Sequence, residues 1–225
     1  GHPILNGITL DLTTPRVGFV GRNGSGKSTL ARVVCGLVKP DQGQVRVDDI
    51  GVFKNRRKAL SKIGILFQNP DHQIIFPTVL EEMSFGLTQQ GHPKDIVRQM
   101  VADALVQFGK SAWSSRSIST LSQGQRHLVC LMSVLVMQPK VVVLDEPFTG
   151  LDRPITRQLT QILADINQML LHISHDLEAL RDYDRVIWLE RGTVQMDGAP
   201  QTVLPAYCAA MDAIGGQDAF ADITG

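Results

Sequence analysis

The sequence predicts an α/β fold with a mainly parallel sheet, an antiparallel β subdomain and an inserted α-helical subdomain. Short, wholly apolar runs alternate with helical patterns, as the buried strands of a parallel sheet do. These runs lie at 17–20, 63–67 and 141–144. Apolar and polar residues alternate at 8–12 and 44–48, which indicates half-exposed strands. From about 72 to 138 the pattern is helical, which predicts the insertion.

Length and composition limit the classes of protein. The chain has 225 residues, 43% of them hydrophobic, enough for one large domain that carries an insertion, and we expect a single domain over 1–225. Lysine plus arginine equals aspartate plus glutamate at 22 each, so no nucleic-acid partner is indicated. The longest apolar stretch, Leu128 to Met137, is too short to span a membrane and predicts a buried helix. Three widely spaced cysteines suit a reducing compartment and form no zinc motif.

Residues 21–29 read GRNGSGKST and fit the pattern G-x-x-x-x-G-K-[ST] completely. A glycine-rich turn that opens onto a helix N-terminus presents backbone N–H groups to a phosphate chain. Lys27 can reach the β- and γ-phosphates, and the Ser28 hydroxyl can bind Mg²⁺. This pattern predicts a phosphate-loop NTPase core. The nucleotide-binding residues expected here are Gly21, Asn23, Gly24, Ser25, Gly26, Lys27, Ser28 and Thr29.

Each further element has its own local signal. Leu30 to Cys35 continues the phosphate loop as a helix that ends at Gly36. Thr78 and Glu81 form a capping box, and Pro93 stands in the first turn of a helix whose apolar face runs from Ile96 to Phe108. After 141–144, strands are expected at 170–173 and 185–189, with a helix at 155–166 between them. We expect a loose tail from about 205 to 225.

Two carboxylates follow the buried strand at 141–144. Asp145 is placed to hold Mg²⁺ through its water shell, and Glu146 is placed to orient and deprotonate the water that attacks the γ-phosphate. The alternatives are a strand-end acid that caps the next helix and an exposed acidic turn. The phosphate loop upstream favours the catalytic interpretation.

With these motifs together, the chain resembles the nucleotide-binding subunit of an ABC transporter. Gln68 follows an apolar strand, and residues 121–125, Leu-Ser-Gln-Gly-Gln, are similar to the family's L-S-G-G-Q signature. Gly150-Leu151-Asp152 resembles the D-loop, and His175 resembles the switch histidine. All of these motifs stand in the family's order, from the first strand to about residue 204.

The resemblance implies roles for these residues. Glu146, His175 and Gln68 are catalytic, and Ser28, Gln68 and Asp145 hold Mg²⁺. Ser122, Gly124, Gln125 and Asp152 bind ATP, the signature residues acting on the nucleotide of an opposing subunit. The active unit is then a head-to-tail dimer with a second copy or with a paralogous ATPase.

The chain departs from the family's pattern in three places. Gln123 stands where the signature usually has glycine, and Leu128 stands where an arginine often follows. The aromatic residue that stacks on adenine normally lies in a strand well before the phosphate loop, and this chain begins at Gly1, too late to contain it. The missing first strand suggests truncation, and it leaves the choice of ATP over GTP as what the resemblance implies.

Residues 66–73, Leu-Phe-Gln-Asn-Pro-Asp-His-Gln, look like the F-Q-N-P-D-x-Q segment of energy-coupling-factor importers. The resemblance implies uptake of a vitamin such as biotin or a transition metal such as cobalt. It also implies an integral membrane coupling component and a substrate-binding membrane component as partners, with the chain peripheral on the cytoplasmic face of the cell membrane. The alternative is a soluble ABC ATPase that drives assembly of a partner complex, of the iron–sulfur scaffold type.

Overall fold

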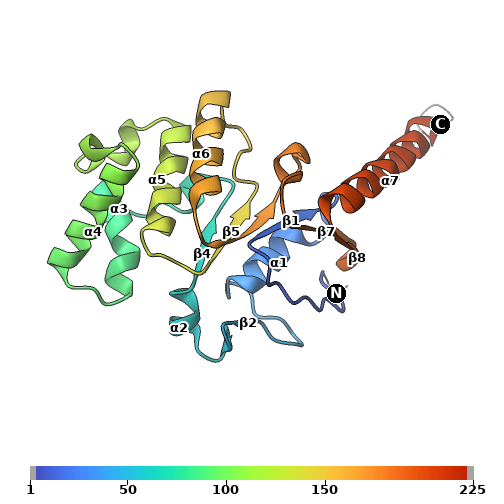
Figure 1. The fold of residues 1–225 in the computed structure, drawn as a ribbon, viewed down its shortest axis with the longest axis horizontal. Coiled ribbons are helices and arrows are strands. Elements are labelled where there is room, and N and C mark those ends of the chain that lie inside the picture. The colour runs from blue at the N-terminus through green and yellow to red at the C-terminus, as the bar shows by residue number, and fades with distance from the viewer. Residues whose placement is uncertain (1–3, 222–225) are drawn as a thin grey trace. The chain divides into compact units, whose positions relative to one another are not determined.

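The computed structural model describes residues 4–221, whose helices and strands Figure 1 shows. The chain divides into two compact units. The terminal unit combines the N-terminal residues through Arg32 with the residues from Met169 onward. The middle unit is Val33–Gln168. Each unit contains parallel strands and helices, so the predicted mixed α/β class with a mostly parallel sheet is confirmed.

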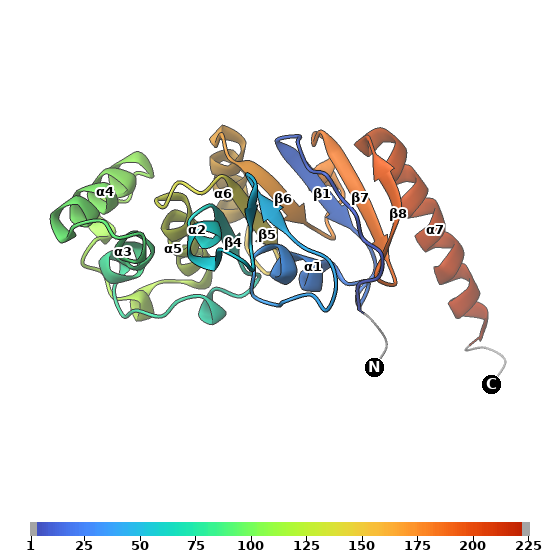
Figure 2. The ribbon, with the colours of Figure 1, turned by 90° about the horizontal axis from the view of Figure 1, so that it is seen from below.

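The terminal unit is built on four strands in the order β6-β1-β7-β8, which lie side by side in Figure 2. β1 pairs in parallel with both β6 and β7, whereas β8 is antiparallel to β7. β1 is almost wholly buried, as its unbroken apolar sequence predicts. The strands are β1 (Arg16–Val20), β6 (Met169–Ile173), β7 (Arg185–Glu190) and β8 (Thr193–Gly198). Helix α1 (Lys27–Val34) follows β1.

The last helix, α7 (Pro200–Ala221), corrects the prediction of a loose tail at about 205–225. The prediction was wrong for 205–221, and 222–225 lie outside the described residues. The first turns of α7 bury Val203 and Leu204 in an apolar cluster of the terminal unit. The ring of Tyr207 also meets that of Trp188 edge-on, with 5.5 Å between centroids. This packing holds the helix although Pro205 lies inside it.

The middle unit holds the parallel pair β4 (Ile63–Leu66) and β5 (Val141–Asp145). A small antiparallel hairpin, β2 (Arg46–Val47) and β3 (Ile50–Gly51), turns through Asp48 and Asp49, which both have positive φ. Two-residue hairpin turns favour this conformation. The Asp48 carboxylate contacts the ammonium groups of Lys62 and Lys140, which precede β4 and β5, and so ties the hairpin to the parallel pair.

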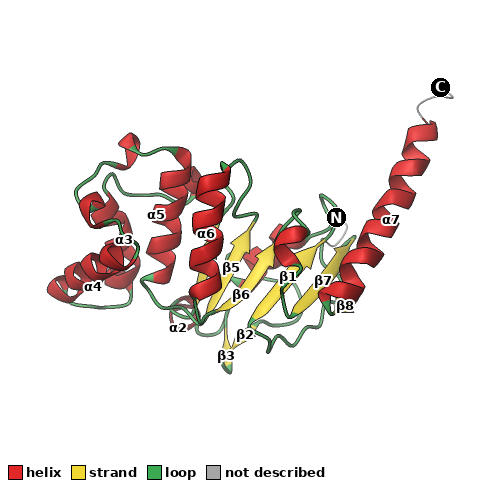
Figure 3. Ribbon diagram, turned by 45° about the horizontal axis from the view of Figure 1, so that its top comes forward, coloured by secondary structure: helices red, strands yellow, loops and turns green. Residues whose placement is uncertain are grey.

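Helices make up most of the remaining middle unit. The described helices are α2 (Arg56–Leu60), α3 (Val79–Gln89), α4 (Lys94–Gln107), α5 (Gln123–Leu135) and α6 (Arg153–Asp165). Thr78 caps α3 by accepting the Glu81 N–H, as predicted, whereas Pro93 is the cap residue that precedes α4 and does not lie in its first turn. α5 and α6 run side by side (Figures 1 and 3). The helical content of 72–138 is confirmed, while its status as a separate insertion stays a prediction.

The alternation at 8–12 is the clearest error of strand prediction. Residues 4–15 carry no strand, and 44–48 shortens to the two residues of β2. Near this N-terminal segment, the Asn6 N–H donates to the Gly192 carbonyl, and the Asp11 carbonyl accepts from the Arg185 side chain. These isolated hydrogen bonds hold the N-terminal segment in place, although it does not pair with a neighbouring strand.

The three cysteines are free thiols. Cys35 and Cys130 are buried and Cys208 is exposed. Burial, together with the nearby Asp145 charge, raises the pKa of Cys35 to about 12, and burial also raises the pKa of Cys130. None of the helices formed by residues 4–221 combines the length and apolar character needed to cross a membrane.

Two buried histidines make stability depend on pH. Burial lowers the pKa of His127 and His172 from 6.5 to about 4. Between those values the unfolded chain binds more protons, so the free energy of unfolding decreases as pH falls from 6.5 to 4. We expect a loss of about 2 to 3 kcal/mol per histidine by pH 4. Urea unfolding at stepped pH measures the loss.

His127→Leu removes one titrating group and should make this decline shallower, whereas the exposed His92→Gln should leave it unchanged. An equally steep decline in wild type and His127→Leu would contradict the assignment.

Candidate functional site

The phosphate loop lies between β1 and α1 in the terminal unit. The Lys27 side chain is buried and its ammonium donates to the carbonyl oxygens of Gly21 and Arg22, at 2.7 and 2.9 Å. The loop is closed by the Ser25 N–H, which donates to the Arg22 carbonyl at 3.1 Å. The lysine charge is therefore held against the loop backbone, next to the N-terminus of α1, where an anion is favoured.

His175 lies beside this loop. β1 and β6 are parallel with Phe19 opposite Ile173, so Gly21 and His175 emerge two residues later from the same edge of the sheet. The Ser174 N–H donates to the Phe19 carbonyl at 3.3 Å, and the Ser174 hydroxyl accepts the Asp176 N–H at 3.0 Å. The terminal unit thus brings together two of the predicted motifs.

The middle unit brings together Gln68, Asp145 and Glu146. β4 and β5 are parallel with Leu66 opposite Leu144, so Gln68 and Glu146 lie level at the carboxyl ends of neighbouring strands. Asp145, the last residue of β5, is 7% exposed. One strand edge thus carries an amide and a carboxylate of the predicted catalytic set, Gln68 and Glu146, beside Asp145, a predicted metal ligand.

Glu146 has an unusual backbone. Its φ of 56° lies in the left-handed region, which residues other than glycine, asparagine and aspartate rarely adopt. The Thr149 hydroxyl donates to Glu146 Oε2 at 3.3 Å, and the Thr149 N–H donates to the Glu146 carbonyl. Backbone strain held by surrounding structure is common at functional sites, which supports a specific role for this carboxylate.

The signature residues form the N-terminus of α5. The Ser122 hydroxyl accepts the Gln125 N–H at 3.3 Å, and the Gln125 side chain accepts the Ser122 N–H at 3.1 Å. This reciprocal capping box orders the first turn of a thirteen-residue helix. The helix N-terminus carries partial positive charge, as binding of a phosphate requires.

The D-loop packs beside the signature. Asp152 caps α6 by accepting the Ile155 N–H at 3.0 Å. A Cβ added to Gly124 would lie 2.9 Å from the Ile155 side chain, and one added to Gly150 would lie 3.8 Å from the Gln123 amide nitrogen. The unusual Gln123 therefore lies against the D-loop, and Gly124 permits close packing onto α6.

Sequence reasoning missed two charged side chains near these motifs. Glu82 is buried and accepts the N–H groups of Ile75 and Phe76, both at 2.9 Å. Arg126 pairs with Asp71, the two lying 3.0 Å apart from Nε to Oδ1. Glu82 could have been noticed in the sequence, because a glutamate on the apolar face of a helix is unusual. The Arg126–Asp71 pair could not, because the two residues are distant in the sequence.

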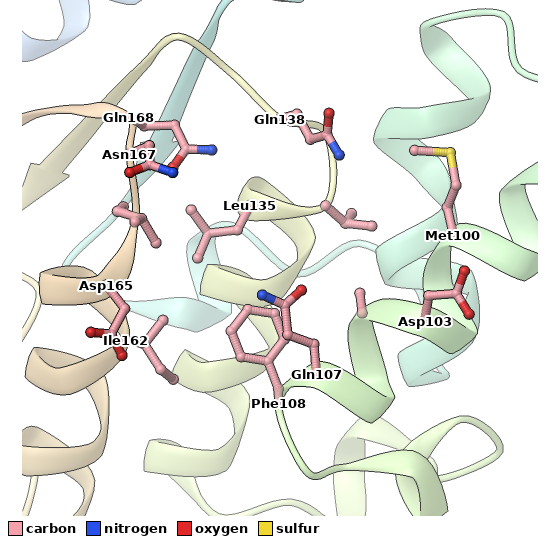
Figure 4. Close-up of a pocket in the computed structure, with 13 residues that line it drawn as sticks. Met100, Asp103, Gln107, Phe108, Leu135, Gln138, Ile162, Asp165, Asn167 and Gln168 are labelled. Carbon is pink, nitrogen blue, oxygen red and sulfur yellow. The ribbon is translucent and has the colours of Figure 1, made fainter.

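A hollow of about 540 Å³ lies elsewhere in the middle unit, among the ends of α4, α5 and α6 (Figure 4). Its lining mixes apolar side chains with amides and the carboxylates of Asp103 and Asp165. None of the predicted site residues lines it, so the motifs rather than this hollow define the candidate site. The lining residues are Met100, Asp103, Ala104, Gln107, Phe108, Leu135, Val136, Gln138, Ile162, Asp165, Ile166, Asn167 and Gln168.

Comparison with known proteins decides the family. The sequence profile described as "ABC transporter" matches residues 5–149, which is well over half of the chain. The chain belongs to the ABC transporter family. It is the ATP-binding and ATP-hydrolysing component, as the motifs predict.

Curated ABC relatives match over most of this ATPase. The biotin transport ATP-binding protein BioM of Rhodobacter capsulatus is 45% identical over 214 residues, which cover 95% of this chain and 92% of the relative. The energy-coupling factor transporter ATP-binding protein EcfA1 of Ligilactobacillus salivarius is 35% identical, covering 89% of this chain and 73% of the relative.

Solved ABC ATPase structures share the fold. The cbiO1 subunit of Clostridium perfringens, described as part of the ABC transporter complex cbiONQ, aligns with a TM-score of 0.76 at 32% identity, covering 90% of this chain and 84% of that one. The ATP-binding cassette MJ0796, in a dimeric post-hydrolysis state bound to ADP and Pi, aligns with a TM-score of 0.77 over 88% and 90%. At 24% identity the second shows the fold alone.

Two glycine substitutions test the phosphate loop of this ABC ATPase. A Cβ on Gly21 would overlap the Leu189 carbonyl oxygen, whereas one on Gly24 would meet nothing within 4 Å, although both have positive φ. Gly21→Ala should weaken binding of a fluorescent ATP analogue by at least about tenfold, since backbone must move. Gly24→Ala should cost less, because only conformational strain is added. Equal losses would contradict this account of the loop.

Proposed function

We propose that this chain powers an energy-coupling-factor importer, with ATP hydrolysis driving uptake of a vitamin such as biotin or a transition metal such as cobalt. The observation that carries the proposal is the place of Gln68: it belongs to the segment 66–73 that is similar to such importers, and it lies level with Glu146 just beyond the ends of the paired strands β4 and β5. The biotin transport relative, 45% identical, favours biotin. In this proposal the chain is peripheral on the cytoplasmic face of the membrane.

The chain's own residues divide the work of hydrolysis. The phosphate-loop N–H groups bind the triphosphate, and the Lys27 ammonium exchanges the Gly21 and Arg22 carbonyls for the β- and γ-phosphates. Glu146 accepts the proton of the attacking water as general base. His175 donates to the γ-phosphate and stabilises the charge that develops there.

The candidate metal ligands suit Mg²⁺. Ser28, Gln68 and Asp145 offer a hydroxyl, an amide and a carboxylate, and hard oxygen donors of this kind are what Mg²⁺ prefers. Bound by these residues, Mg²⁺ would supply positive charge that offsets the negative charge of the triphosphate.

The proposed active unit is a head-to-tail dimer, with a second copy or a paralogous ATPase. Ser122, Gly124 and Gln125 at the start of α5, and Asp152 of the D-loop, then contribute to the nucleotide site of the opposing chain. The capped, ordered N-terminus of α5 supports this role, because an anion site must be preorganised to bind well.

An apolar patch supports contact with the integral membrane coupling component, which would in turn hold the substrate-binding component. Ile75 is 68% exposed and Phe85 39% exposed, and the Phe85 ring packs against that of Phe76 at a tilt of 44°, with 5.3 Å between centroids. Glu82 fixes the backbone of Ile75 and Phe76 from beneath. The patch follows the Gln68 loop and suits the apolar face of a partner helix.

The second candidate function is a soluble ABC ATPase that drives assembly of a partner complex, of the iron–sulfur scaffold type. The same exposed patch would then contact a scaffold protein. Purification of the tagged chain from native membranes and cytosol separates the two: recovery with an integral membrane protein supports transport, and recovery with soluble scaffold proteins alone supports assembly.

Glu146→Gln tests the catalytic base. The substitution keeps the size of the side chain and removes its basicity, so steady-state ATP hydrolysis should fall by about 10²- to 10⁴-fold. Nucleotide binding should persist, and an ATP-bound dimer should accumulate on size-exclusion chromatography. Normal turnover by this variant would show that another group is the base.

Ile75→Ser with Phe85→Ser tests the membrane contact. The double variant should lose most co-purification with the membrane component while keeping its basal ATP hydrolysis, since the patch makes no bond to the catalytic set. Val106→Ser is the matched control, because Val106 is 66% exposed on α4. Equal recovery of the membrane component with both variants would exclude the patch as the contact.

A further inference from the structure

The Arg126 side chain bridges two motifs of the middle unit. Its Nε lies 3.0 Å from the carboxylate of Asp71, and its Nη1 donates to the Leu121 carbonyl at 2.9 Å. Leu121 immediately precedes Ser122, and Asp71 lies three residues after Gln68. One guanidinium group therefore joins the entrance of the signature to the turn that follows the catalytic glutamine.

That turn is itself ordered. The Asn69 side chain accepts the Asp71 N–H at 2.9 Å at the start of a single 3₁₀ turn, Pro70–His72. The Gln73 side chain accepts the Phe67 N–H at 3.2 Å and closes the loop around Gln68. One turn farther along α5, Cys130 Sγ lies 4.0 Å from the Pro70 carbonyl. The loop is therefore in direct contact with the first turns of α5.

The exposure of the Arg126–Asp71 ion pair indicates that it positions the two motifs and contributes little to the stability of the fold. The Arg126 side chain is 24% exposed and that of Asp71 is 61% exposed. Ion pairs this accessible to water contribute little to folding. The guanidinium group is nevertheless rigid and planar, and it donates a hydrogen bond to the Leu121 carbonyl while its charge pairs with the Asp71 carboxylate.

We propose that Arg126 is a positioning residue that couples the Gln68 loop to Ser122. The inference rests on the proposed function. It adds a set of contacts through which the position of the Gln68 loop affects the signature of the same chain. When the loop shifts, the Asp71–Arg126–Leu121 contacts shift the start of α5, so the signature reaches the opposing nucleotide only when the loop is correctly placed.

The test compares Arg126→Gln, Asp71→Asn and their double variant with Arg46→Gln, which removes an exposed ion pair to Asp49 in the same unit. Three quantities are measured: binding of a fluorescent ATP analogue, ATP-driven dimerisation in the Glu146→Gln background, and kcat and KM for ATP hydrolysis. Thermal unfolding reports on the fold. Arg126→Lys keeps the positive charge and removes the planar guanidinium group with its several donors.

We expect analogue binding and the unfolding temperature to stay as in wild type. The ATP concentration for half-maximal dimerisation should rise about fivefold in both single variants, and kcat should fall by a similar factor with little change in KM. The double variant should be no worse than either single one, because both break the same linkage. Arg126→Lys should restore part of the loss, and Arg46→Gln should match wild type.

The inference is overturned if the single variants behave like Arg46→Gln, if their effects add, or if the unfolding temperature falls in step with kcat. The proposed function fails separately, and the inference with it, if wild type neither hydrolyses ATP nor forms an ATP-dependent dimer in the Glu146→Gln form. If wild type hydrolyses ATP and its Glu146→Gln form dimerises with ATP, but the Arg126 and Asp71 variants behave like wild type, only the role of Arg126 is rejected.

Discussion

Parallel pairing between buried strands is the constraint on which the catalytic residues depend. In the terminal unit, the register of Phe19 with Ile173 brings the phosphate loop and His175 out of the same edge. In the middle unit, the register of Leu66 with Leu144 does the same for Gln68 and Glu146. A shift of one residue in either pair would turn the following side chains to the other face of the sheet. The apolar strand sequences, buried on both faces, specify the register through side-chain packing.

Several residues of the candidate site also maintain helix ends. Ser122 and Gln125 cap α5, and Asp152 caps α6. The groups that stabilise these termini are the same ones that the family resemblance assigns to nucleotide binding. A helix N-terminus combines unpaired N–H groups with a favourable dipole. The same capping residues therefore order the helix end and prepare it to bind a phosphate. Loss of such a side chain is therefore expected to disturb local order and ligand binding together.

How far the sequence predicted the structure depended on how local the determining interactions are. The phosphate loop, the strand that ends at Asp145 and the Thr78 cap are set by neighbouring residues, and all were predicted. α7 was missed because small residues and an internal proline hide a helix whose order comes from packing near Trp188. The alternation at 8–12 misled because a strand also needs a partner backbone. The Arg126–Asp71 pair could not be predicted, since no local pattern records which distant charges meet.

The distribution of the three thiols has a practical consequence. Two are enclosed among apolar side chains, where the reactive thiolate is suppressed, and Cys208 alone is exposed, on α7. Among the described residues one exposed thiol thus offers an attachment point for a maleimide dye or a nitroxide spin label, on a helix away from every motif in the sequence. In the proposed dimer of two copies, distances between the labels would report whether the copies approach and separate during turnover.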